Sequence, residues 1–223
     1  MEDPHIVLEI PDTLPGPLIE NIFSEVKEVD HDSLRIAAVK KTPEVWLSLE
    51  WAIPGLIVAY IAKAYFEGFL NEAGKDNYVR LTNWLKKLLQ RARGLNVVAV
   101  ASSDKKLDPA NSQSKAVSVF LFLKNGQYLK LLFDNELSQN DWENGVEKIV
   151  KMVIDHYEDG ETSILSKELN ALRGMPYAAV YCYINRESKT WKFIDDLTLA
   201  QNLYNPSKKD KERKKQKSKK HKQ

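Results

Sequence analysis

Apolar and polar residues alternate in several short stretches, with the period of a half-buried β-strand. Together with one wholly apolar stretch, this pattern predicts strands at residues 5–11, 34–40, 44–51 and 96–101. After the first strand and its Pro-Gly-Pro turn, Leu18, Ile22 and Val26 recur at helical spacing. The chain is therefore expected to begin with a strand and a helix at 18–28.

Two further helices are predicted before the middle of the chain. Residues 54–71 are apolar on almost every side, which is typical of a helix enclosed on all faces. The apolar run at 51–62 is shorter than a membrane span and includes Pro54 and Gly55. A second helix at 78–93 has an apolar stripe and is followed by Gly94, a residue that commonly ends helices.

The second half of the chain contains the strongest local signals. Asn125-Gly126 joins apolar runs at 117–123 and 128–133, and this dipeptide favours a tight β-hairpin because both residues accept positive φ. Ser138 and Asp141 resemble a capping arrangement ahead of an apolar stripe at 142–157. The remaining pattern predicts a short helix at 164–172, a second hairpin formed by 177–184 and 190–194, and a helical turn at 197–204.

These elements predict an α+β fold. The expected architecture is a mostly antiparallel sheet with β-hairpins, covered by three to four helices, one of them a fully buried apolar helix. Residues 1–206 are expected to form one globular domain, and residues 207–223 a disordered basic tail. A long surface loop is expected at 102–115, where no apolar period is found.

Composition favours an intracellular protein. Hydrophobic residues make up 43% of the chain, enough for a core without disulfides, and Cys182 is the single cysteine. The acidic start of the chain does not resemble a signal peptide. A reducing, cytoplasmic location is therefore expected, with nuclear import possible in a eukaryotic host.

Charge is distributed unevenly along the chain. The net charge is +2, but residues 207–223 contain ten Lys or Arg and two acids, so the tail carries +8 and the first 206 residues −6. The tail is rich in Lys and has no aromatic residue, which favours non-specific attraction to phosphates over sequence reading. Nucleic acid is the favoured polyanion; anionic lipid and a merely solubilising role are the alternatives.

A second group of cations lies on the predicted helix at 78–93, which contains no acidic residue. These cations can form a phosphate-binding patch, or they can simply be a solvated helix face. The predicted polyanion-binding residues are Lys86, Lys87, Arg91 and Arg93 of this helix, with Lys208, Lys209, Lys211, Arg213, Lys214, Lys215, Lys217, Lys219, Lys220 and Lys222 of the tail.

Catalytic signatures are scarce. The sequence has no glycine-rich phosphate loop, zinc-binding pattern or nucleophile elbow, and neither a cofactor nor a metal ion is predicted. Asp30-His31-Asp32 is interpreted as a polar turn and Asp155-His156 as the end of a helix. The pair Asp195-Asp196 could bind a divalent ion, but Asp196 as a helix cap is the simpler interpretation.

Three functional hypotheses follow. The absence of catalytic motifs favours a non-enzymatic binding or regulatory module that holds a polyanion through its tail and a protein partner through its domain. The alternative is a metal-dependent enzyme acting on nucleic acid or a nucleotide, with Asp195, Asp196 or Glu50 as ligands. The third is a membrane-acting protein that uses residues 51–93 as a helical hairpin.

Overall fold

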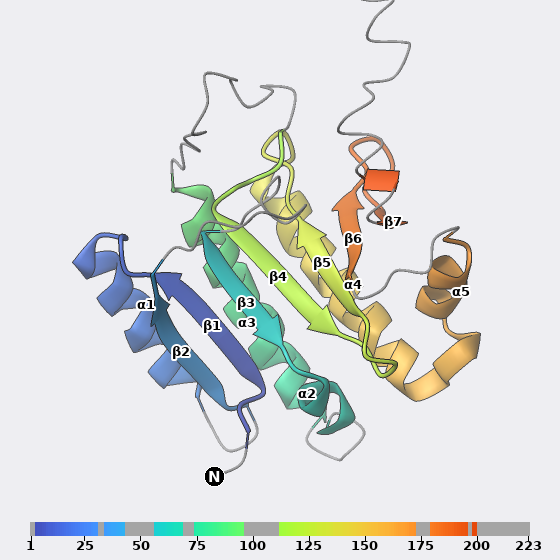
Figure 1. Ribbon diagram of the computed structural model, residues 1–223, viewed down its shortest axis with the longest axis horizontal. Coiled ribbons are helices and arrows are strands. Elements are labelled where there is room, and N and C mark those ends of the chain that lie inside the picture. The colour runs from blue at the N-terminus through green and yellow to red at the C-terminus, as the bar shows by residue number, and fades with distance from the viewer. Residues whose placement is uncertain are drawn as a thin grey trace, which may run out of the picture.

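The fold is built on one mixed β-sheet (Figure 1). The computed structural model describes residues 3–30, 34–42, 56–68, 74–95, 112–172, 179–195 and 198–199. Within these residues, the sheet has seven strands in the order β2-β1-β3-β4-β5-β6-β7. The strands are β1 (Ile6–Pro11), β2 (Ile36–Lys41), β3 (Ile57–Ile61), β4 (Val117–Phe122), β5 (Tyr128–Leu132), β6 (Ala179–Ile184) and β7 (Trp191–Asp195).

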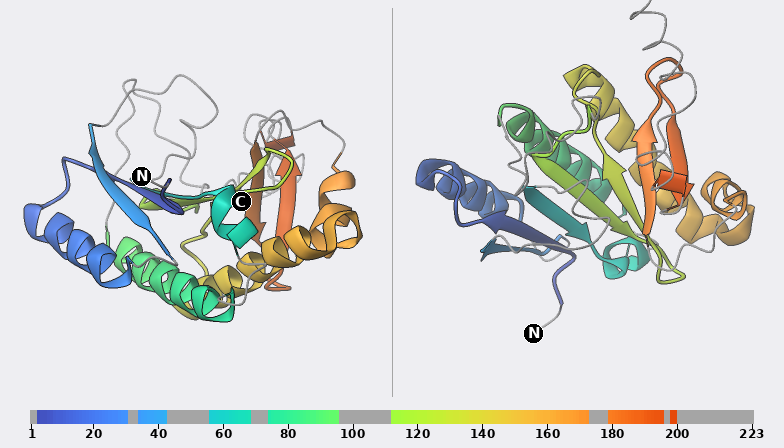
Figure 2. Two further views of the ribbon diagram at one scale, coloured as in Figure 1. Left: turned by 90° about the horizontal axis from the view of Figure 1, so that it is seen from below. Right: turned by 45° about the horizontal axis from the view of Figure 1, so that its top comes forward.

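The long helices lie side by side on one face of this sheet, as the left view of Figure 2 shows. They are α1 (Gly16–Val29), α3 (Gly74–Arg93) and α4 (Gln139–Asp159). Two short helices, α2 (Lys63–Gly68) and α5 (Ile164–Asn170), precede α3 and follow α4. The opposite face carries none of these three long helices, and we call it the open face.

Neighbouring strands alternate between parallel and antiparallel pairing. The pairs β1–β2, β3–β4 and β5–β6 are parallel, and the other three pairs are antiparallel. Each parallel pair is connected through helices, because a chain must cross over the sheet to re-enter it in the same direction. The predicted α+β class is confirmed, whereas the prediction of a mostly antiparallel sheet holds for only half of the pairings.

The predicted buried helix at 54–71 is wrong over much of its length. Residues Ile57–Ile61 form β3, a central strand between β1 and β4, and helix begins only at Lys63. Ile57, Ala59 and Ile61 are buried beneath the helices, while Val58 and Tyr60 lie on the open face. A central strand with apolar residues on both faces reads as a continuous apolar run, which periodicity alone does not distinguish from a buried helix.

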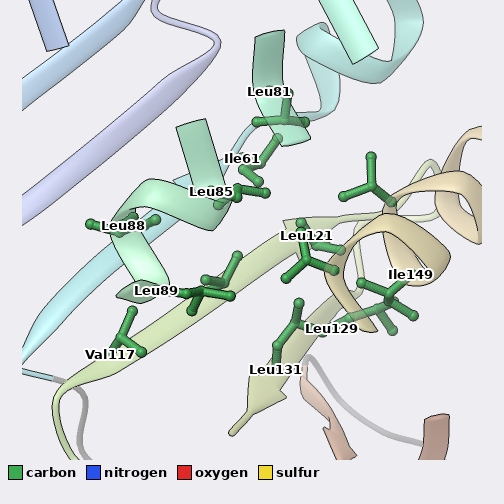
Figure 3. Packing of buried hydrophobic residues seen from close by; sticks show 14 of the residues in the cluster. Ile61, Leu81, Leu85, Leu88, Leu89, Val117, Leu121, Leu129, Leu131 and Ile149 are labelled. Atoms are coloured by element: carbon green, nitrogen blue, oxygen red, sulfur yellow. The ribbon is translucent and has the colours of Figure 1, made fainter. Parts of the chain in front are cut away.

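The core lies between the sheet and the helix layer (Figure 3). Leucines of α3 and branched residues of β3, β4 and β5 meet there with Ile149 of α4. Each such side chain contributes about 1.5–3 kcal/mol when fully buried. The labelled members are Ile61, Leu81, Leu85, Leu88, Leu89, Val117, Leu121, Leu129, Leu131 and Ile149.

The strongest local predictions are confirmed. The Asn125-Gly126 turn joins β4 and β5, with Gly126 at a φ of 85°. Ser138 and Asp141 form a capping box at the start of α4: the Ser138 hydroxyl accepts from the Asp141 amide, and the Asp141 carboxylate accepts from the Ser138 amide. The second hairpin, β6–β7, and the helix before it are also present.

Several other predictions lie outside the described residues. They are the strands at 44–51 and 96–101, most of the loop at 102–115 and of the turn at 197–204, and the tail at 207–223. None of the helices within the described ranges is long and apolar enough to cross a membrane.

Gly145 lets α4 approach the β6–β7 hairpin closely. A Cβ at this position would lie 2.5 Å from Cδ1 of Ile184 and 3.4 Å from the Trp191 ring. The backbone carbonyl of Gly145 also accepts a 2.7 Å hydrogen bond from the Trp191 indole nitrogen. A methyl group at this position therefore fits only if the buried Ile184 side chain moves.

We predict that Gly145→Ala destabilises the protein, although alanine is about 1 kcal/mol better than glycine inside a helix. The clash with Ile184 should outweigh that gain, since overpacking costs about 1–3 kcal/mol. Urea unfolding measures the difference. In an Ile184→Val background, which lacks the Cδ1 atom, Gly145→Ala should become neutral or stabilising; an equal penalty in both backgrounds would refute the explanation.

Candidate binding surfaces

The four predicted cations of α3 do not form one free patch. The Lys86 ammonium binds the Glu147 carboxylate of α4, and the Arg91 guanidinium binds the Glu25 carboxylate of α1. Both pairs are partly shielded from solvent. These two cations therefore join α3 to its neighbouring helices, and their charge is already balanced by protein carboxylates.

The other two predicted cations are exposed. Lys87 has no hydrogen bond or ion pair among the described residues. The Arg93 guanidinium lies over the Trp142 ring, with its carbon 5.0 Å from the ring centroid. A guanidinium on an aromatic ring keeps its charge and most of its donors. Lys87 and Arg93 can thus still meet a phosphate.

Arg93 also lines a polar hollow of about 370 Å³ at the end of α3. Lys115, just before β4, contributes a second cation to its wall, and Asn135 contributes an amide. Lys115 was not among the predicted site residues, because its neighbours in sequence belong to the expected loop. The hollow brings these two cations together from segments about twenty residues apart.

A row of side chains crosses the open face from one edge of the sheet to the other. In register, it consists of one residue from each strand: Ala37, Val7, Tyr60, Phe120, Lys130, Tyr181 and Ile194. Phe122, Tyr128 and Tyr183 share this face, because they are two residues along a strand from members of the row. Six aromatic side chains are thereby gathered on the four adjacent strands β3 to β6.

The aromatic rings of this face contact one another. Tyr60 and Phe120 are stacked, with centroids 4.9 Å apart and planes at 21°. Tyr128 packs at a tilt against both Phe120 and Phe122. The Lys130 ammonium lies 5.2 Å from the Phe120 centroid and 5.8 Å from that of Tyr181. A cation between ring faces is stabilised by the ring quadrupoles.

An apolar hollow of about 390 Å³ opens at the end of this aromatic surface. Two aromatic residues, Tyr60 and Phe122, line it together with Val7 and Ala62. Lys63 is its one charged lining residue and forms a half-exposed ion pair with Glu67, with 3.3 Å between nitrogen and oxygen. The hollow is therefore apolar, and the charge of its one lysine is already balanced by a carboxylate.

The chain reaches the open face again just before its tail. Leu199 packs with Leu132 of β5 and Tyr181 of β6 in a second, smaller apolar cluster. The tail begins at residue 207, eight residues after Leu199. The first tail cation, Lys208, is nine residues from Leu199, and nine residues span at most about 32 Å, so this cation is tethered within that distance of Leu199.

Two of the acidic residues singled out in the sequence, Asp195 and Asp30, have structural partners. Asp195 caps the turn after β7: its carboxylate accepts from the Thr198 amide at 2.7 Å and the Thr198 hydroxyl at 2.8 Å. Asp196, the predicted cap, lies outside the described residues. Asp30 accepts from the Ile36 amide at 2.8 Å, as expected of a turn residue. The described residues include no group of three or more His, Cys, Asp or Glu placed to hold a metal ion.

A charge network around the buried Asp134 fixes the β6–β7 loop. Arg186 of this loop binds Asp134 with 2.6 Å between Nε and Oδ2, and it also binds Glu136 and the Ser112 hydroxyl. Burial alone would raise the pKa of Asp134, but hydrogen bonds from Arg186, the Glu136 amide and Ser112 together hold it below its ordinary value. This cluster is internally satisfied and joins three segments of the chain.

His156 and two serines form the one buried histidine–hydroxyl cluster of the described residues. Ser163 donates to Ser166 at 3.0 Å, and Ser166 donates to the Gly160 carbonyl at 2.7 Å. Because the Ser166 proton is used in that bond, Nδ1 of His156 must donate to Ser166 across 2.8 Å. The imidazole therefore does not act as a base toward Ser166, and the cluster connects α4 to α5.

The other ring nitrogen of His156, Nε2, is buried without a hydrogen-bond partner among the described residues. Burial lowers the pKa of His156, and the charge of Lys124 adds to this effect. Asp155, its neighbour in sequence, instead pairs with Lys151 at 2.8 Å. The predicted Asp155-His156 feature is thus the end of a helix, as expected, and its two side chains have different partners.

Comparison with models of known protein families, with curated proteins and with solved structures finds no match to this chain. Functional inference therefore depends on the surfaces described above.

We predict that His156 makes the protein less stable in mild acid. Its pKa is lowered in the folded state, so below about pH 6.5 the unfolded chain binds more protons than the folded chain. Folding stability should fall as the pH drops from 7 towards 5, by at most about 1.4 kcal/mol per pH unit from this group. Urea unfolding at several pH values measures this slope.

His156→Asn provides the comparison, because its amide can still donate to Ser166 and does not titrate in this range. The variant should show a flatter pH dependence below pH 6.5, whatever its stability at pH 7.5. Equal slopes for the two proteins would contradict the assignment.

Proposed function

We propose that the protein is a non-enzymatic binding module that holds nucleic acid through its basic C-terminal tail. The observation that carries this proposal is the separation of charge along the chain, with +8 in residues 207–223 and −6 in the residues before them. A dense run of cations without apolar residues attracts phosphates and gains affinity by releasing counterions. The acidic remainder of the chain offers no comparable attraction for a polyanion.

Exposed cations of the globule support this proposal at short range. Lys87 is exposed on α3, and Arg93 and Lys115 share the wall of the polar hollow. They supply a small number of additional phosphate contacts. Lys86 and Arg91 contribute less, because their charges are already paired with Glu147 and Glu25.

We predict that neutralising the tail removes most of the salt-dependent binding. The variant replaces all ten tail Lys and Arg by Gln in the full-length chain, so the globule is unchanged. Duplex DNA affinity is measured at several salt concentrations. The logarithm of affinity falls with that of salt by about 0.9 for each phosphate contacted, so a contribution from half of the tail cations would be a slope difference of about 4–5.

Two outcomes would overturn the tail proposal. One is an unchanged slope after neutralisation. The other is binding of the full-length protein to anionic phosphatidylserine vesicles but not to DNA or RNA at equal salt, which would assign the tail to a membrane surface instead.

We predict that Lys87→Gln reduces the salt slope by about 0.9, the value for one phosphate contact. Lys27→Gln is the matched control, because Lys27 is also an exposed helix lysine and its loss changes the net charge equally. The control should leave the slope almost unchanged. Equal effects of the two substitutions would show that only net charge matters and that α3 makes no direct contact.

A further inference from the structure

We propose that the polar hollow at the end of α3 is a site for a phosphate monoester, which in nucleic acid is the terminal phosphate of a strand. This inference deepens the proposed function and rests on it for the nucleic acid. It replaces two general phosphate contacts, those of Arg93 and Lys115, by one discrete site. Small phosphate esters carry the same group, so the test separates the two sources.

The first argument is that the hollow presents hydrogen-bond donors that the protein itself does not use. The Arg93 guanidinium lies on the Trp142 ring, and neither it nor the Lys115 ammonium has an ion pair or hydrogen bond within the described part of the chain. The side-chain amide of Asn135 has no such partner there either. Guanidinium and ammonium groups only donate. Their natural complement is an oxyanion, which only accepts.

The second argument is a buried hydroxyl in the wall of the hollow. Ser114 is 6% exposed, and its oxygen accepts a 3.2 Å hydrogen bond from the Ala116 amide. The proton of this hydroxyl has no acceptor among the residues that the structure describes. Buried polar groups usually have their hydrogen bonds satisfied, because an unmade bond costs the desolvation of the group. An anion in the hollow would accept this proton.

The third argument is that the fold fixes the walls before any ligand arrives. The segment before β4 is joined to the chain after β5 by backbone hydrogen bonds. The Ser114 amide donates to the Phe133 carbonyl at 2.6 Å. The Asn135 amide donates to the Ser112 carbonyl at 2.9 Å. Donors held in place in this way lose little conformational freedom when they bind, so less of the interaction is spent on ordering them.

The charges around the hollow also favour an anion. Its lining residues among those described include no carboxylate. Asp134 and Glu136, the two acids next to Asn135 in sequence, are both bound by Arg186. The dipole of α3 would account for one cation in its last turn, but it does not explain Lys115, which belongs to another segment.

The number of cations favours a monoester over an internal phosphodiester. A monoester carries about 1.5–2 negative charges at pH 7 and has three free oxygens. A phosphodiester of the nucleic-acid backbone carries a single charge. Two unpaired cations, Arg93 and Lys115, therefore balance the charge of a monoester and exceed that of a diester.

The test compares a short oligothymidine that carries a 5′-phosphate with the same strand carrying a 5′-hydroxyl, both labelled with fluorescein at the 3′ end. Affinities for the full-length protein are measured by fluorescence anisotropy at one salt concentration. The tail meets the internal phosphates of both strands, so its contribution cancels in the ratio of affinities. The 5′-phosphate strand should bind about 10-fold more tightly, the lower value for one hydrogen bond to a charged group.

Arg93→Gln and Lys115→Gln should each reduce this ratio, and the double variant should bring it to one. Lys87→Gln is the matched control: it removes the same charge from α3, but Lys87 does not line the hollow. The control should weaken both strands equally and leave the ratio unchanged. Lys115→Gln decides the matter if Arg93→Gln folds poorly through loss of its contact with Trp142. A ratio that Lys115→Gln and the double variant leave unchanged would overturn the inference.

The second measurement separates the two sources of the group. Binding of adenosine 5′-monophosphate and of adenosine is measured by titration calorimetry with the natural protein and the double variant. If the nucleotide binds, adenosine does not, and the double variant loses that binding while the strand ratio is one, the hollow takes a small phosphate ester. A strand ratio of one without any binding of the nucleotide shows that the hollow is not a phosphate site.

The neutralised-tail variant separates this inference from the proposed function. If it loses affinity for both strands but keeps the ratio, the tail and the hollow both act as proposed. If the natural protein binds both strands equally through its tail and does not bind the nucleotide, the proposed function stands and the hollow inference is wrong. If the natural protein binds the nucleotide through the hollow but neither strand, the proposed function falls and the monoester site remains.

Discussion

The whole structure depends on burying one face of a seven-stranded sheet beneath a single layer of three long helices, α1, α3 and α4. Each long helix belongs to the connection between two parallel strands, so the three crossovers all lie on the same side. This arrangement fills one face with leucine, isoleucine and valine. On the opposite face, aromatic rings of β3, β4 and β5 pack against one another, and Phe120, Lys130 and Tyr181 are buried.

Elements defined by nearby residues could be predicted from the sequence, and those defined by distant partners could not. The Asn125-Gly126 turn and the Ser138–Asp141 capping box are complete within a few residues. The parallel pairing of β5 with β6 joins residues about fifty positions apart, so no local pattern specifies it. Strand β3 was mistaken for helix because Val58 and Tyr60 make its second face apolar as well.

The candidate site also has features that the sequence predicts and features that only the structure shows. The tail's charge is a property of composition and needs no structure. The α3 cations looked equivalent in sequence, yet Lys86 and Arg91 are paired because α4 and α1 place carboxylates beside them. A signal for the aromatic surface was present in the period-two series Phe120, Phe122, Tyr128 and Lys130, which lies on one face of a hairpin. The contribution of Tyr60 required the parallel β3–β4 pairing and was not visible.

On the proposed function, the basic tail and the exposed cations of the globule differ in range, and this difference gives each a distinct role. Attraction by the tail acts over about a Debye length, roughly 8–10 Å at physiological salt, and depends little on sequence. A phosphate contact with Lys87 or Arg93 requires close approach. Lys208 follows Leu199 by nine residues, which span at most about 32 Å, so a polyanion captured by the tail would be held near the globule at a high effective concentration. Modest affinity at each element would then be enough for firm binding.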